Sequence, residues 1–181
     1  ISDPAQIYCD TFERMIQMNL YPVAAAGYAA QNFMANQGLF VVIGATAALS
    51  ATPGSLAYGV SKAAVHHYVQ SFGSITGKAL STKTQRKLAR TLRQDAECLD
   101  DMTIAGILPT TIDTPSNRAA MPHAIQSKWT DPKDIAIEIG RWIDEPHLRP
   151  HSGSLIKVIS DGSSSTDTDT KREPAVFQIA R

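Results

Sequence analysis

Tyr58 and Lys62, in the stretch "AYGVSKAAVHH" at residues 57–67, are the residues whose types and spacing most directly suggest chemistry. Four residues apart on a helix, their side chains share one face. A free phenol has a pKa of about 10 and is a poor proton donor near neutrality. A neighbouring ammonium favours the phenolate and lowers that pKa. The pair is therefore a candidate acid with its tuning cation, although the same spacing also arises by chance.

The surrounding sequence predicts where this pair lies. The apolar, β-branched run "LFVVIGATA" (39–47) is typical of a strand buried on both faces. A loop and a helix over 58–75 follow it, and "MTIAGILP" (102–109) and "GSLIKVIS" (153–160) predict two more strands. Ligands bind beyond the carboxyl ends of parallel strands, so we expect the site in the loops after the first two strands.

Two further helices complete the predicted fold. Apolar residues recur at helical spacing over 4–35, where Pro22 is expected to kink or break the helix. Another helix begins after Thr130 or Asp131 as cap, with Pro132 in its first turn. Alternating helices and strands predict an α/β fold: a Rossmann-like, doubly wound, mostly parallel sheet, here partial, with about three strands and three main helices.

The chain has 181 residues, enough for one domain with a sizeable core. We expect residues 1–160 to form one catalytic part of a Rossmann-type domain. Residues 77–101 are basic and polar and predict a surface insertion containing an amphipathic helix. Residues 161–181 predict a polar, flexible tail.

Composition narrows the class of protein. Seventeen basic and 17 acidic residues balance, which argues against a nucleic-acid or membrane-surface partner. Cys9 and Cys98 are interpreted as reduced packing thiols, which favours a cytoplasmic protein. His66 and His67 are adjacent, so they point to different faces and are interpreted as packing or surface residues; no metal site is expected.

Several segments together resemble the short-chain dehydrogenase/reductase family. "YGVSK" after "GATAALSATPGSLA" is similar to the Y-x-x-x-K signature of that family. "TPGSLAYGVSKAAVH", "ILPTTIDTPSNRAAMP", "SKWTDP" and "RPHSGSLIKVIS" are similar, in the right order, to the branch that reduces quinonoid dihydropterins. They cover most of residues 38–160. The resemblance implies a Rossmann-type fold and a nicotinamide cofactor, NADH with NADPH possible.

The resemblance also implies roles for individual residues. Tyr58 matches the catalytic proton donor, Lys62 the lysine that holds the nicotinamide ribose, and Asn19 the asparagine that positions that lysine through a water. Thr110 stands where most members have glycine. The implied cofactor-binding residues are Tyr58, Lys62, Gly44, Ala45, Pro109, Thr110, Thr111 and Thr114.

Ala45 departs from the common pattern of the family. Many members carry a serine thirteen residues before the tyrosine, where its hydroxyl polarises a substrate carbonyl. The pterin-reducing branch resembles this chain in carrying alanine there, and a quinonoid dihydropterin is already a strong hydride acceptor. Ala45 and Tyr58 are therefore the predicted substrate-binding residues, and the product would be a tetrahydropterin.

The glycine-rich turn that receives the pyrophosphate in the family has no counterpart in this sequence, which begins at Ile1. We therefore expect a segment of a longer enzyme whose first strands lie outside it. The resemblance implies a homodimer formed by helices 4–35 and 58–75. Two alternatives stay open: a family member acting on another electron-poor substrate, and a truncated, non-catalytic fragment that dimerises through its helices.

Overall fold

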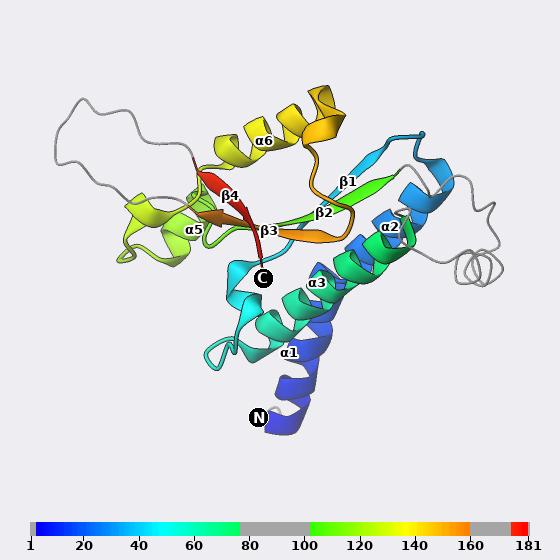
Figure 1. Ribbon diagram of the computed structural model, residues 1–181. Coiled ribbons are helices and arrows are strands. Elements are labelled where there is room, and N and C mark those ends of the chain that lie inside the picture. The colour runs from blue at the N-terminus through cyan, green and yellow to red at the C-terminus, as the bar shows by residue number, and fades with distance from the viewer. Residues whose placement is uncertain (1–2, 77–101, 160–174, 181) are drawn as a thin grey trace, which may run out of the picture.

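The computed structural model of the chain describes residues 3–76, 102–159 and 175–180. The elements are α1 (Pro4–Asn19), α2 (Tyr21–Phe33), β1 (Leu39–Ile43), the 3-10 helix η1 (Thr46–Leu49), α3 (Leu56–Thr76), β2 (Thr103–Leu108), α5 (Pro115–Ala120), η3 (Gln126–Lys128), α6 (Pro132–Asp144), η4 (Pro146–Leu148), β3 (Ser154–Ile159) and β4 (Val176–Ile179). A four-stranded sheet has α6 on one face and α1, α2 and α3 on the other (Figure 1).

The sheet has the order β1-β2-β3-β4. β1 pairs with β2, and β2 with β3, in parallel, whereas β3 pairs with β4 antiparallel. The predicted α/β, Rossmann-like architecture with a mostly parallel sheet is confirmed. The carboxyl ends of β1 and β2 therefore lie at one edge, as the proposed site requires.

Alternate residues of the central strand pack into two cores. Ile104 and Leu108 of β2 lie in the core that α2 and α3 cover. Ala105 and Ile107 face the other way, toward Trp142 of α6. This two-sided burial explains the nearly continuous apolar run in β2, because a strand covered on both faces needs no polar positions.

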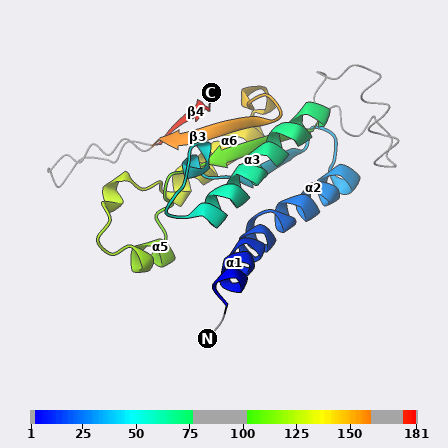
Figure 2. The same ribbon diagram turned by 90° about the horizontal axis from the view of Figure 1, so that it is seen from below.

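The first predicted helix is broken where Pro22 suggests. α1 ends at Asn19, and α2 begins at Tyr21 with Pro22 in its first turn, where a missing N–H costs no helical hydrogen bond. Both helices run alongside α3, and α1 packs directly against it (Figure 2). The break places Asn19 at a helix end beside α3.

The start of α6 also follows the sequence closely. Asp131 caps it by accepting from the Lys133 N–H at 2.9 Å, and Pro132 occupies its first turn.

The structure near the C-terminal end of the sequence differs from the prediction. A flexible tail is predicted over 161–181, but Val176–Ile179 form β4 and pair with β3. Pairing satisfies the open edge of β3, an effect that composition does not reveal. The predicted insertion at 77–101 lies outside the described residues.

Candidate active site

Tyr58 and Lys62 lie on one face of α3, at the edge where β1 ends. The Lys62 amine donates to the Ile43 carbonyl, the last residue of β1, at 2.9 Å. Burial lowers the pKa of the Lys62 amine and raises the pKa of the Tyr58 phenol. The direction for Tyr58 is opposite to the one that the sequence predicts, because burial disfavours the phenolate and the lysine binds a carbonyl. Tyr58 thus keeps its proton at neutral pH.

Asn19 reaches α3 through Ser61, a residue that the sequence analysis missed. The Asn19 amide donates to the Ser61 hydroxyl at 2.9 Å, and that hydroxyl donates to the Tyr58 carbonyl at 2.8 Å. Ser61 is fully buried. Asn19 therefore anchors the first turn of α3, the turn that carries Tyr58. The only signal in the sequence was a small polar residue three positions after Tyr58 on a helix.

The turn after β1 carries the predicted residues Gly44 and Ala45, and both are buried. The Ala45 N–H donates to Nε2 of His66 at 3.1 Å. A Cβ atom at Gly44 would lie 2.6 Å from the same nitrogen, so only glycine fits there without a shift. His66 is a packing residue, as predicted, and it also makes a hydrogen bond at the site; His67 is exposed.

Thr46 joins the turn after β1 to the end of β2. Its hydroxyl donates to the Leu108 carbonyl at 2.6 Å, and its N–H donates to the Pro109 carbonyl at 3.0 Å. This brings Pro109 and the following threonines beside the turn that holds Ala45. A cavity of about 430 Å³ opens there, lined by Thr46, Thr110, Thr111, Ile125, Lys128, Trp129, Lys157, Val158 and Ile159.

Thr114 takes a different position from the other predicted residues. It caps α5, and its hydroxyl oxygen accepts from the Asn117 N–H at 3.2 Å. The segment before it is held to the chain by Thr130, whose N–H donates to the Thr111 carbonyl at 2.7 Å. Arg118 pairs with Asp113 through two bonds of 2.6 and 2.7 Å. Thr114 therefore shapes this segment and does not line the cavity beside Thr111.

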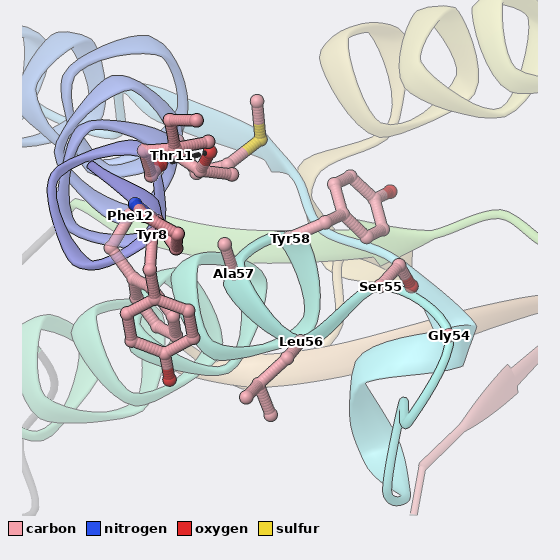
Figure 3. Close-up of a pocket in the computed structure, with 11 residues that line it drawn as sticks. Tyr8, Thr11, Phe12, Gly54, Ser55, Leu56, Ala57 and Tyr58 are labelled. Atoms are coloured by element: carbon pink, nitrogen blue, oxygen red, sulfur yellow. Dashed lines mark hydrogen bonds between the residues drawn. The ribbon is translucent and has the colours of Figure 1, made fainter. Parts of the chain in front are cut away.

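A second cavity, of about 550 Å³, lies between α1 and the start of α3. Tyr8 of α1 lies opposite Leu56 and Ala57, and the Tyr58 hydroxyl points away from Tyr8 (Figure 3). Its lining is mostly apolar and aromatic, and the ring of Tyr58 forms one wall. Tyr58 therefore belongs to this apolar cavity, whereas Lys62 on the same helix binds the end of β1.

A curated relative matches most of the chain. The dihydropteridine reductase of Dictyostelium discoideum is 34% identical to this chain over 155 residues, an alignment that covers 86% of the chain. The chain is a homologue of that reductase over this span. It spans 59% of the length of that relative. A family model described as "Enoyl-(Acyl carrier protein) reductase" also matches residues 3–83.

The fold agrees with that of a solved dehydrogenase. A 4-hydroxyisoleucine dehydrogenase mutant, complexed with NADH and succinate, superposes with a TM-score of 0.52 and is 21% identical. The match covers 82% of this chain and 57% of the solved one. At that identity the likeness extends to the fold, which is Rossmann-type. Among the helices that the structure describes, none combines the length and the apolar character needed to cross a bilayer.

Proposed function

We propose that this chain is the catalytic part of an NADH-dependent reductase that converts a quinonoid dihydropterin to the tetrahydropterin. The observation that carries the proposal is the placement of Tyr58 and Lys62 on one helix face at the end of β1, next to the turn in which Ala45 offers no hydroxyl. The similarity to a dihydropteridine reductase supports the substrate class.

Each residue has a defined task in this reaction. Tyr58, which is half-buried, donates the proton from its hydroxyl. The Lys62 amine binds the ribose hydroxyls of the nicotinamide nucleotide, for which its N–H donors at the strand edge are suited. When bound, NADH supplies the hydride; NADPH is the second candidate. Pro109, Thr110 and Thr111 border the nicotinamide end, and Thr114 holds their segment.

The lack of a side-chain hydroxyl at Ala45 favours an electron-poor substrate. A carbonyl substrate develops negative charge on oxygen during hydride transfer and gains from a hydroxyl donor at this position. Ala45 is 3% exposed and supplies only a methyl group there. A reductase of a different electron-poor compound is the runner-up, and competition between quinonoid dihydropterin and such compounds in one assay separates the two.

The outer helices support a homodimer. Large apolar side chains are exposed along them: Ile7, Tyr8, Met18, Tyr21, Tyr28, Phe33, Leu56 and Val60. An apolar surface of this kind is typical of an interface. We place the two-fold contact on α1, α2 and α3, and we assign the protein to the cytoplasm.

Replacement of Tyr58 by phenylalanine in the intact protein tests the proposal. Tyr58→Phe removes the proton donor, and we expect quinonoid dihydropterin reduction to fall by about 10²- to 10⁴-fold. Tyr68→Phe is the matched control, because Tyr68 lies on the same helix and packs against Phe72 with ring centroids 5.7 Å apart. Unchanged turnover in Tyr58→Phe would refute its role as proton donor. If NADH fails to bind at all, the alternative of a non-catalytic fragment is correct.

A further inference from the structure

His66 is the third residue on the face of α3 that carries Tyr58 and Lys62, at successive spacings of four. It is 5% exposed. Its Nε2 accepts the Ala45 N–H at 3.1 Å, so the imidazole touches the turn that would face the substrate. The proposed reaction does not yet use this residue.

Three consecutive residues of that turn are fixed to α3. Lys62 binds the Ile43 carbonyl, His66 binds the Ala45 N–H, and Gly44 between them has no room for a side chain because of the imidazole. The same helix carries Tyr58. The two contacts therefore set the distance between the proton donor and the wall formed by Ala45.

The contact requires one protonation state. Nε2 can accept a hydrogen bond only when the imidazole is neutral with its proton on Nδ1. Burial, and after it the positive charge of Lys62, lowers the pKa of His66. Lys62 is the charged group acting on it among the described residues, and the neighbouring β1 turn and β2 present Gly44 and Leu108.

We propose that His66 is a positioning residue, whose neutral imidazole holds the Ala45 turn against α3 and so sets the substrate wall opposite Tyr58. Protonation of His66 removes the acceptor and releases the turn. Because the folded-state pKa lies below the ordinary value of about 6.5, the contact stabilises the fold above that pH. That contribution is lost as the pH falls through the lowered pKa.

Two substitutions separate positioning from simple packing. In His66→Gln, an amide oxygen can accept the Ala45 N–H and cannot titrate; in His66→Leu, the volume is roughly kept and the acceptor is lost. We expect His66→Leu to lower kcat about tenfold or more, since a misplacement of about 1 Å can cost on the order of 10²-fold. The KM for NADH should change little. His66→Gln should keep most of kcat and lose the acid limb of the pH profile. His67→Gln, at the exposed neighbour, is the matched control.

The kinetic part rests on the proposed function, and a spectroscopic measurement does not. Long-range ¹H–¹⁵N NMR of the intact protein reports which imidazole nitrogen carries the proton. A neutral His66 imidazole, with its proton on Nδ1 and none on Nε2, that persists below a pH of about 6.5 supports the inference even if dihydropterin is not the substrate. A neutral imidazole with its proton on Nε2, or a His66→Leu variant with wild-type kcat well below its melting temperature, overturns it. A His66→Gln variant as slow as His66→Leu also overturns it.

Discussion

The edge of the sheet beside α3 and the outer face of α1 and α2 differ in whether their side chains find partners within the chain. At the edge, polar groups are bound within the chain: Asn19 to Ser61, Lys62 to the Ile43 carbonyl, and His66 to the Ala45 N–H. On the outer face, large apolar groups are left in solvent, with Phe33 82% exposed and Tyr28 66% exposed.

This difference indicates what each region needs from outside the chain. A buried polar network is rigid when its members are satisfied, so the edge is already organised for chemistry before a ligand arrives. Exposed aromatic side chains gain free energy only when another surface covers them. The edge is therefore expected to respond to substitution through turnover, and the outer face through assembly.

The largest effect is expected from Lys62→Met at the edge. The substitution removes the amine that binds the Ile43 carbonyl and, in the proposed reaction, the ribose. We expect kcat/KM to fall by about 10³-fold, which corresponds to about 4 kcal/mol. Steady-state kinetics with NADH and quinonoid dihydropterin measure this.

Lys133→Met on α6 is the control for that loss, because Lys133 is exposed and belongs to a helix on the opposite face of the sheet. It should leave kcat/KM unchanged. An equal loss in both lysine variants would contradict a specific role for Lys62. The edge would then be no more important to turnover than the exposed surface of α6.

The next effect belongs to the outer face. Phe33→Ser should weaken the proposed homodimer by about 2 kcal/mol, roughly 30-fold in dissociation constant, since buried aromatic side chains dominate interfaces. Turnover per assembled dimer should be retained. Sedimentation velocity over a range of protein concentrations measures the change.

Ile137→Ser tests whether exposure alone explains such a result. Ile137 is 69% exposed on α6, on the other face of the sheet, and its replacement should leave the proposed dimer intact. Equal dissociation constants for wild type and Phe33→Ser would place the interface elsewhere. The outer face would then not be the region that responds to substitution through assembly.

A smaller effect, on stability, is expected from Gly44→Ala. The added methyl carbon would lie 2.6 Å from His66 Nε2, so the turn or the imidazole must shift, at a cost of about 1–2 kcal/mol. For a domain of this size that lowers Tm by about 2–8 °C. Gly54→Ala is the control, since a Cβ there meets nothing within 4 Å. A Tm that falls equally in both would show that the close packing at Gly44 is not limiting.

The sequence predicts the parts of the fold that local chemistry determines. Pro22 interrupts the first helix because a proline lacks an N–H, and Asp131 with Pro132 begins α6, so both boundaries are visible in the residues themselves. The apolar run that becomes β2 is equally clear. Tyr58 and Lys62 can be selected because their spacing follows a predicted strand.

Features that depend on distant elements meeting could not be predicted. Ser61 matters because the end of α1 approaches α3, and His66 makes its contact because the turn after β1 does. The short strand β4 follows a polar tract and exists through its pairing with β3. The raised pKa of Tyr58 likewise reflects burial, which overrides the expectation from the nearby lysine.

The smallest expected effect is that of Ser61→Ala, which tests the link between the two helices. Ser61 is fully buried, and its loss leaves the Asn19 amide without the hydroxyl that accepts its hydrogen bond. We expect a loss of about 1 kcal/mol in the free energy of unfolding, and a decrease in kcat of a few-fold as the first turn of α3 loosens. Urea denaturation and steady-state kinetics measure the two quantities. Ser71→Ala, at an exposed position of the same helix, should change neither. If Ser61→Ala lowered stability without touching kcat, Asn19 and Ser61 would hold α1 to α3 but would not help to place Tyr58. The organisation of the edge would then depend on Lys62 and His66 alone.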